Sequence, residues 1–282
     1  MTSHDVVYLV RRKTGIKKVG HTGTLDPNAA GVLPICIGQA TKVSQYLLEG
    51  NKTYRAELTL GLKTDTQDIY GDIIDEGIVK SSLEDIKKVI LSFVGVYDQI
   101  PPMYSALKVK GEKLYELARK GIEIERKARR VEIYSIDIIS IKENKVLFDV
   151  NCSKGTYIRT LCHDIGEKLG CGGIMSFLLR TSTNNFNIDS AITLEELQET
   201  KDIETILKPM DFPLYHMPKI NISDIHKKAA LNGNKIPLSS MPSTIYMGEN
   251  IRIYLEDNFI GIGQVKRDDL KKLYIKFSRL FA

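Results

Sequence analysis

The sequence predicts an α+β fold, in which helices flank a mixed, mostly antiparallel sheet and a small β-rich module follows. Apolar and polar residues alternate over residues 54–60, as they do in a half-buried strand. Residues 83–94 instead carry apolar side chains at helical spacing, preceded by a capping-box pair at Ser81 and Glu84. Three prolines between residues 209 and 218 mark a linker, and further alternating segments lie beyond it.

The bulk composition indicates a globular protein rather than a membrane protein. The chain has 282 residues, of which 43% are hydrophobic and 27% are charged. No run approaches the roughly 20 apolar residues of a membrane span, so we expect a cytoplasmic protein. The length favours a large domain over residues 1–210 and a smaller one over residues 211–282. The net charge of +5 is compatible with a nucleic-acid partner.

The N-terminal elements follow from capping residues and alternation. Thr2 and Ser3 cap a helix that ends at Gly15, and residues 32–37 form an apolar run typical of a buried strand. A short helix over residues 41–48 and a strand over residues 52–60 come next. Residues 61–77 are polar and predict a loop.

The middle of the chain interrupts and then resumes the sheet. An irregular insertion of about residues 100–130 contains a short helix near residues 113–120. Strands over 131–141 and 146–153 form a hairpin that turns at residues 143–144.

A helix and a strand complete the large domain. Residues 156–169 predict a turn and a helix, and residues 174–183 predict another strand. A second capping box at Thr193 and Glu196 starts a helix before the linker. In the C-terminal module, a helix near residues 223–232 precedes strands such as residues 251–255.

A twelve-residue loop, residues 20–31, carries the chemistry. It contains three glycines, a proline, a histidine and a single carboxylate, Asp26. Glycine and proline favour a shaped loop, and the residue before a proline is biased away from helical angles. An isolated Asp-Pro more often caps a turn than performs chemistry, so the interpretation depends on the rest of the chain.

Other common site types are absent from the sequence. There is no G-x-x-x-x-G-K-[ST] phosphate loop and no complete dinucleotide fingerprint. The four cysteines lack the spacing of a zinc site or a disulfide framework, so we expect buried free thiols and no metal.

Several segments together resemble bacterial tRNA pseudouridine-55 synthases, the TruB family. They occur in the same order between residues 20 and 178. The segments are residues 20–31 (GHTGTLDPNAAG), 52–54 (KTY), 100–108 (IPPMYSALK), 152–159 (CSKGTYIR) and 166–171 (GEKLGC) followed by Leu178. The H-T-G-T-L-D-P and K-G-T-Y-I-R pieces together are very specific.

The resemblance implies a fold of the pseudouridine synthase type and an activity. The family converts a uridine in the T-arm of tRNA (U55) to its C-glycoside isomer without a cofactor. It implies that Asp26 is the nucleophile, that Tyr54 packs against the target base and that Tyr157 lies beside the nucleophile. Arg159 is then the partner of Asp26, and His21 and Leu178 contact the flipped nucleotide.

The residue chemistry agrees with these implied roles. Breaking a glycosidic bond and re-forming it through carbon requires an ionised carboxylate near the sugar or the base. A nearby arginine favours the charged form of such a carboxylate in a water-poor pocket. Taken alone, a tyrosine such as Tyr54 is more often a packing residue, and an arginine such as Arg159 is more often a solvated charge on a helix. The functional interpretation therefore depends on all of these residues occurring together.

Family members usually carry a strand with a Lys-Pro-x-Gly motif just before the segment matched by residues 2–7. The motif and its strand are not present in this sequence, in which the matched segment starts at residue 2. We therefore expect an unpaired sheet edge. The C-terminal module matches the PUA-type RNA-binding domains of the family only weakly.

The insertion is the most basic part of the chain. Residues 108–130 hold nine basic and four acidic side chains, a net charge of +5. The basic ones are Lys108, Lys110, Lys113, Arg119, Lys120, Arg126, Lys127, Arg129 and Arg130. Such a run is often only a solvated helix face, but we expect Arg126, Lys127, Arg129 and Arg130 to contact RNA.

We therefore predict a monomeric tRNA pseudouridine synthase that needs no obligatory protein partner. Two alternatives remain open at this stage. The protein could modify another RNA, or it could bind or fold tRNA without catalysis.

Overall fold

The computed structural model describes residues 1–109 and 111–281, so that Lys110 of the basic insertion lies outside the described residues. The chain forms two compact units, each assembled from segments that are distant in the sequence. Unit 1 contains Met1–Ser3, Thr24–Leu33 and Glu49–Ala191, and unit 2 contains His4–Gly23, Pro34–Leu48 and Ile192–Ala282. The domain boundary predicted at residue 210 stays a prediction.

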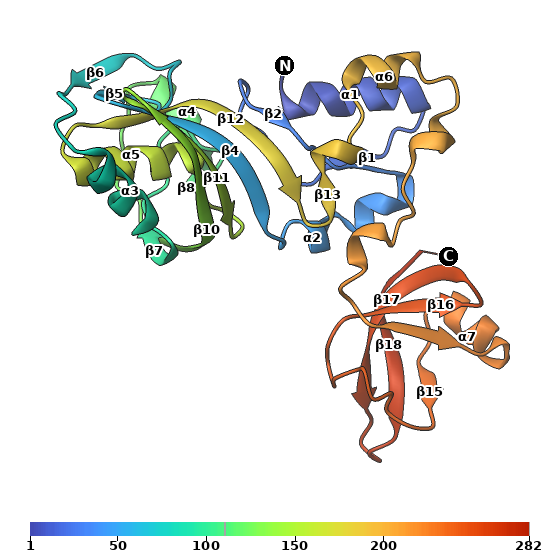
Figure 1. Ribbon diagram of the computed structural model, residues 1–282. Helices are drawn as coiled ribbons and strands as arrows, with labels where there is room; N and C mark the ends of the chain where they lie inside the picture. Colours follow the sequence, from blue (N-terminus) through green and yellow to red (C-terminus); the bar gives the residue numbers. More distant parts are fainter. Residues whose placement is uncertain (110, 282) are drawn as a thin grey trace. The chain divides into compact units, whose positions relative to one another are not determined.

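Unit 1 is built on a seven-stranded sheet (Figure 1). Its strands are β2 (Ala30–Gly31), β4 (Lys52–Leu60), β7 (Gly95–Gln99), β10 (Arg129–Lys142), β11 (Lys145–Cys152), β12 (Gly173–Thr183) and β13 (Phe186–Asn187). They lie in the order β13-β12-β4-β11-β10-β7, with β2 beside β12. Only the β2–β12 pair is parallel among these neighbours. The predicted mixed, mostly antiparallel sheet is confirmed.

Helices α3 and α5 pack against this sheet, and smaller elements surround it. The helices are α3 (Leu83–Leu91), α4 (Leu114–Arg119), α5 (Ile158–Leu169) and the 3₁₀ turn η2 (Ile188–Ser190). α5 packs on β12 and β4, and α3 packs on α5 and β10 (Figure 1). The core between them includes Phe148, Ile86 and Leu161, which are fully or nearly fully buried. Two short hairpins pair β5 (Leu62–Thr64) with β6 (Ile73–Glu76) and β8 (Lys108–Val109) with β9 (Glu112–Lys113).

Most long elements agree with the sequence prediction. The strand over residues 52–60, the hairpin turning at residues 143–144 and the helix ending at Leu169 are confirmed. Gly170 ends α5 in the left-handed region, with φ of 73°, as the sequence pattern of a helix stop requires.

Three local predictions are wrong, and one strand was not predicted. Residues 32–37 do not form one strand, because Pro34 lacks an N–H and Val32 donates its own to the carbonyl of Arg180. The predicted loop at residues 61–77 contains the β5–β6 hairpin, and β7 was not predicted. The N-cap of α3 is Ser82, whose hydroxyl accepts from the N–H of Asp85, rather than Ser81.

Unit 2 contains an N-terminal layer and a C-terminal β module. The layer consists of α1 (Ser3–Thr14), β1 (Val19–His21), β3 (Ile35–Ile37), η1 (Gly38–Lys42), α2 (Ser44–Leu47), α6 (Leu194–Glu199), η3 (Ile203–Ile206) and η4 (Phe212–Leu214). β1 and β3 pair antiparallel. The capping box of α6 is present, with Thr193 and Glu196 as its two members. Val7, Val10, Val19 and Leu197 form the buried core of this layer.

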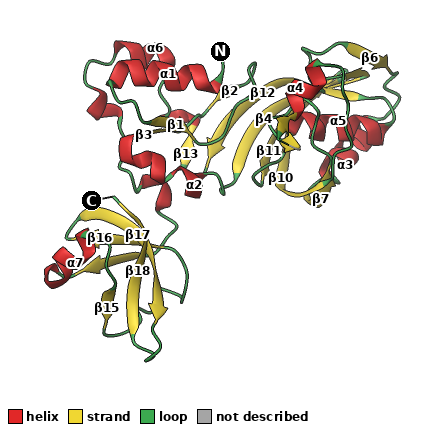
Figure 2. Cartoon of the chain, turned by 180° about the vertical axis from the view of Figure 1, so that it is seen from behind, coloured by secondary structure: helices red, strands yellow, loops and turns green. Residues whose placement is uncertain are grey.

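The C-terminal module is a curled five-stranded sheet with its own apolar core (Figure 2). Its elements are β14 (Lys219–Ile222), η5 (Asp224–His226), α7 (Lys227–Leu231), β15 (Ile236–Leu238), β16 (Ile251–Leu255), β17 (Asn258–Arg267) and β18 (Leu273–Leu280). The strand order is β14-β16-β17-β18-β15. The predicted β character of this part is confirmed. No helix within residues 1–109 and 111–281 is long and apolar enough to cross a membrane.

Candidate active site

The loop that carries Asp26 is fixed at both ends within unit 1. At its start, the hydroxyl of Ser3 accepts from the N–H of Leu25 at 3.0 Å, and the N–H of Ala29 closes a turn onto the carbonyl of Asp26. At its end, Gly31 has a φ of 114° and runs so close to β12 that a Cβ there would lie 2.2 Å from the carbonyl oxygen of Arg180. Only glycine fits this approach. Asp26 is therefore held on a loop of defined shape.

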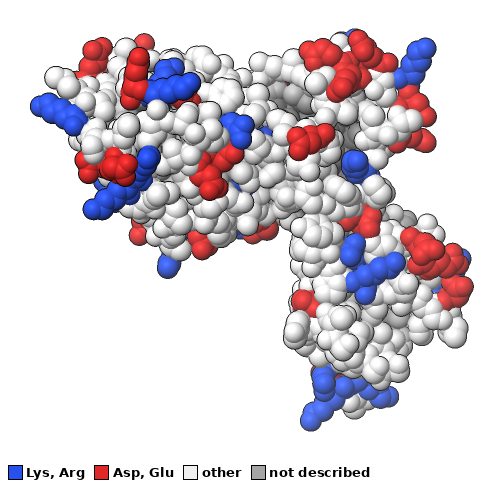
Figure 3. All heavy atoms as spheres, viewed as in Figure 1, with Lys and Arg blue, Asp and Glu red and all other residues white. Residues whose placement is uncertain are grey.

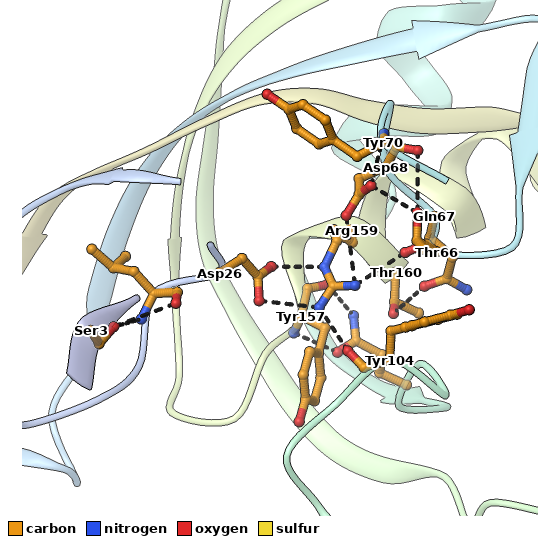
Figure 4. Close-up of polar contacts among 12 residues, drawn as sticks. Ser3, Asp26, Thr66, Gln67, Asp68, Tyr70, Tyr104, Tyr157, Arg159 and Thr160 are labelled. Carbon is orange, nitrogen blue, oxygen red and sulfur yellow. Dashed lines mark hydrogen bonds and ion pairs between the residues drawn. The ribbon is translucent and has the colours of Figure 1, made fainter. Parts of the chain in front are cut away.

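Arg159 contacts the carboxylate of Asp26 with two nitrogens (Figure 4). Its Nε lies 2.7 Å from Oδ2, and its Nη2 donates to Oδ1 at 3.2 Å. The side chain of Arg159 is 6% exposed, whereas that of Asp26 is 38% exposed. The predicted partnership of these two residues is present in the structure.

Two backbone carbonyls hold the guanidinium of Arg159 in place. Its Nη1 donates to the carbonyl of Thr66 at 3.1 Å, and its Nη2 donates to that of Tyr104 at 3.0 Å. A second carboxylate, that of Asp68, lies 3.8 Å from Nη1. The guanidinium lies between Asp26 on one side and Thr66 and Asp68 on the other (Figure 4). Charge-assisted bonds of this kind fix an arginine more firmly than neutral ones.

The loop that supplies Thr66 and Asp68 was not recognised from the sequence. The Oδ1 of Asp68 accepts from the hydroxyl of Thr66 at 2.7 Å and from the N–H of Tyr70 at 3.0 Å. Gln67 has a positive φ of 64°, and its Oε1 accepts from the hydroxyl of Thr160 at 2.7 Å. The run Thr64-Asp65-Thr66-Gln67-Asp68 is the only sequence signal, since several side chains that favour tight turns follow one another there.

Tyr54 and Leu178 lie on neighbouring central strands. Both are 8% exposed and belong to the same buried cluster, Tyr54 on β4 and Leu178 on β12. Burial raises the pKa of the Tyr54 hydroxyl to about 12, so this phenol stays protonated at neutral pH. Both contribute apolar surface to unit 1, which also holds Asp26.

Tyr157 is the N-cap residue of α5 and is half-buried. Burial raises the pKa of its hydroxyl, while the charge of Arg159 acts in the opposite direction. Figure 4 shows Tyr157 next to Arg159, with its ring on the side away from Asp68. The turn at the start of α5 thus places two predicted site residues close together.

Among the remaining predicted residues, Arg129 acts on the site, because its charge opposes the burial that raises the pKa of Tyr157. His21 ends β1 in unit 2, so its predicted contact with a nucleotide stays a prediction. Arg126 donates to Glu123 at 2.8 Å and to the carbonyl of Pro101. Lys127, Arg129 and Arg130 are exposed and make no ion pair within the residues that the structure describes.

No metal centre or reactive thiol is recognisable in the described part of the chain. It contains no cluster of three or more His, Cys, Asp and Glu side chains able to hold a metal ion. All four cysteines are free and buried, as predicted, and burial raises the pKa of Cys36 and Cys152 to about 11. Thiols of this kind are poor nucleophiles.

Two family models match consecutive parts of the chain. The TruB family pseudouridylate synthase N-terminal domain matches residues 11–158, and the tRNA pseudouridylate synthase B C-terminal domain matches residues 159–215. The chain therefore belongs to the TruB family of pseudouridylate synthases.

Named relatives match over nearly the whole chain. A protein of Alkaliphilus oremlandii named tRNA pseudouridine synthase B is 60% identical over 99% of this chain and 94% of its own length. A protein of the same name from Clostridium kluyveri is 52% identical over 98% of this chain and 96% of its own length.

Solved structures show the same fold. The crystal structure of a Cbf5-Nop10-Gar1 complex contains a chain that is 29% identical, with a TM-score of 0.75, covering all of this chain and 82% of that one. A chain in the structure of an H/ACA RNP bound to a substrate RNA containing 2′-deoxyuridine is 26% identical, with a TM-score of 0.74 and the same coverage.

Proposed function

We propose that this protein isomerises uridine to pseudouridine in tRNA, at U55 of the T-arm, with Asp26 as the nucleophile. Membership of the family and the names of its relatives support the reaction and the class of RNA. The observation that carries the assignment of the nucleophile is the two-point contact of Arg159 with Asp26. It leaves the carboxylate partly exposed on a loop of fixed shape.

The reaction breaks the bond from N1 of uracil to C1′ of ribose and forms a bond from C5 to C1′. The hydrogen on C5 is released as a proton and N1 takes up a proton from water, so the product is an isomer and no oxidant, reductant or cofactor is consumed. Asp26 forms the covalent intermediate, either at C1′ of the ribose or at C6 of the base. Arg159 orients the carboxylate as water is excluded by the bound base.

The target base must leave the stack before Asp26 can reach it. We assign Tyr54 as the aromatic surface against that base and Leu178 as an apolar contact beside it. Tyr157 borders the nucleophile from the start of α5, and His21 contacts the flipped nucleotide. These roles follow from the resemblance of the motifs, and the shared buried cluster of Tyr54 and Leu178 supports the first two.

The basic insertion and the C-terminal module are the two proposed RNA-binding regions. On the face drawn in Figure 3, Lys and Arg side chains alternate with Asp and Glu over unit 1, and basic side chains gather at one end of the C-terminal module. We expect Arg126, Lys127, Arg129 and Arg130 to contact phosphates, and residues 211–282 to act as an RNA-binding module. We also infer a cytoplasmic monomer that needs no protein partner.

Tritium release tests the activity directly. A T-arm minihelix carrying uridine tritiated at C5 loses its label to water when C5 becomes bonded to C1′. We expect release from the minihelix, and none when the target uridine is replaced by cytidine. Tritium release from another RNA but not from the minihelix would show that the substrate is not the T-arm of tRNA. Tight binding of tRNA without any release would indicate a non-catalytic protein.

Asp26→Asn is the matched control for the nucleophile. It removes the negative charge and keeps the size of the side chain, so binding should stay within a few fold while turnover is lost. Multiple turnover by this variant, shown by mass spectrometry to be undeamidated, would overturn the assignment of Asp26.

A further inference from the structure

Gln99 is a buried amide that the reaction chemistry described above does not use. It ends β7 at the edge of the seven-stranded sheet and is 1% exposed. Its Oε1 accepts from the backbone N–H of Tyr157 at 2.8 Å, and its Nε2 donates to the carbonyl of Tyr157 at 3.0 Å. One side chain thus binds both backbone groups of a single residue, 58 positions away.

The orientation of this amide is determined by its partners. An amide turned by 180° would place its oxygen against the Tyr157 carbonyl and its NH₂ against the Tyr157 N–H. The second hydrogen of Nε2 points to the hydroxyl of Tyr97 at 2.5 Å. The oxygen and both hydrogens of the Gln99 amide therefore have partners, which a substitution would remove.

The start of α5 depends on this contact. Tyr157 is the N-cap residue, and its side chain makes no capping hydrogen bond. Two residues further on, Arg159 reaches Asp26 and the carbonyls of Thr66 and Tyr104. A shift of the first turn would carry the guanidinium away from the carboxylate, and displacements of about 1 Å can lower a rate by about 100-fold.

We propose that Gln99 is a positioning residue for the active site: by clamping the backbone of Tyr157 it sets where α5 begins, and so where Arg159 meets Asp26. This role rests on the proposed function for its effect on catalysis. The clamp itself is a contact that can be measured independently.

Two substitutions separate the clamp from ordinary packing. Gln99→Met keeps the length and apolar bulk but makes neither hydrogen bond. Gln99→Glu can make both only when protonated, since its C=O then accepts from Tyr157 N–H and its O–H donates to the Tyr157 carbonyl. Once ionised, the carboxylate faces the carbonyl and repels it. Burial favours the protonated form of such a glutamate at low pH.

Single-turnover rates with saturating minihelix give the first readout. We expect Gln99→Met to lower the rate by about 10-fold or more at every pH, with the Kd of the RNA within about threefold. The rate of Gln99→Glu relative to that of the unchanged protein should be highest at pH 6 and fall about 10-fold or more by pH 9. Dividing the rate of the variant by that of the unchanged protein at each pH removes the effect of nearby groups that titrate in both proteins, among them Tyr97 and Asp164.

Asn144 provides a matched control. Its side-chain amide donates to the carbonyl of Leu60 at 3.1 Å, in the turn at the opposite end of β11 from the strand end near Tyr157. Asn144→Asp makes the same change of an amide to a carboxylate. We expect its relative rate to be the same at pH 6 and pH 9.

The exchange rate of the Tyr157 amide hydrogen tests the clamp without any activity. Gln99→Met should accelerate this exchange well beyond that of neighbouring amides in α5, whereas Asn144→Asp should not. If both Gln99 variants have unchanged rates and unchanged Tyr157 exchange, the clamp is refuted. If the unchanged protein releases no tritium but exchange responds as expected, the proposed function fails and the clamp stands.

Discussion

Arg159 and Asp26 are 133 positions apart in the sequence, yet two guanidinium nitrogens of Arg159 lie within 3.2 Å of the two carboxylate oxygens of Asp26. The cation is buried and the carboxylate is partly exposed, with side-chain exposures of 6% and 38%. Arg159 therefore contacts Asp26 from the interior of the protein, and the carboxylate of Asp26 is the more accessible of the two groups. A substrate approaching from solvent meets the carboxylate first, which is the arrangement a nucleophile requires.

Arg159→Lys should lower the single-turnover rate by about 100-fold or more, although the positive charge is kept. Lysine has no planar fork, so it cannot hold the carboxylate and the carbonyls of Thr66 and Tyr104 at once. Rapid-quench kinetics measure the rate, and filter binding measures the RNA affinity. A variant within threefold of the unchanged protein would show that charge alone suffices.

Asp164→Asn should stabilise the protein at pH 7.5 more than at pH 4.5. Burial, and secondarily the charge of Glu167, raises the pKa of Asp164 from 3.8 to about 6. The folded state therefore binds more protons than the unfolded state between about pH 4 and pH 6, and stability falls as pH rises through that window. Asparagine does not ionise, so the Asp164→Asn variant does not lose this stability as pH rises.

Thermal melts at the two pH values measure the effect of Asp164→Asn. The same substitution at Asp137, an exposed carboxylate on β10, provides the comparison. Equal changes in Tm for Asp164→Asn at both pH values would contradict the prediction.

Gly166→Ala should lower the free energy of unfolding by about 1–3 kcal/mol, the range typical of overpacking. Gly166 lies in α5 where the helix touches the turn before β12, and a Cβ there would lie 2.1 Å from the backbone nitrogen of Gly173. Backbone cannot move aside as a flexible side chain does. Gly20, whose Cβ would meet nothing within 4 Å, is the control for a glycine-to-alanine change. Similar Tm values for the two variants would refute the close approach.

Local signals in the sequence predicted the long elements, whereas the pair of Asp26 and Arg159 was predicted from the resemblance of several motifs to a known family. The strand over residues 52–60 and α5 have strong periodicity and end at turn residues or glycine, so their assignment needs no tertiary information. The motifs around Asp26 and Arg159 predicted the pair only as a set, because either residue alone is ordinary.

Contacts that depend on the third dimension were missed. Asp68 and Gln99 have no local signature, because their partners lie 91 and 58 positions away. The N–H of Val32 donates to the carbonyl of Arg180 on β12, and only residues 35–37 of the expected strand form β3. The division of the chain into units that interleave in sequence could not follow from composition or periodicity either.

The final prediction concerns where RNA is held. Changing Arg126, Lys127, Arg129 and Arg130 together to Gln should weaken tRNA binding and flatten the dependence of log affinity on log salt. Each phosphate contact contributes about 0.7–0.9 to that slope, so three lost contacts remove about two units or more. Three of these side chains are exposed and free of ion pairs within the described residues, whereas Arg126 bonds Glu123 and the carbonyl of Pro101.

A graded set of variants tests this assignment. Arg126→Gln alone should flatten the slope less than the fourfold change but lower the Tm about as much, because its guanidinium already bonds Glu123 and the carbonyl of Pro101. Changing Lys266, Lys271, Lys272 and Lys276 of the C-terminal module to Gln should flatten the slope less than the fourfold change in the insertion. Salt titrations of binding to full-length tRNA measure all three slopes. If the insertion variant keeps its slope and the C-terminal variant loses it, RNA is held by the C-terminal module, and the exposed charges at the start of β10 only face solvent.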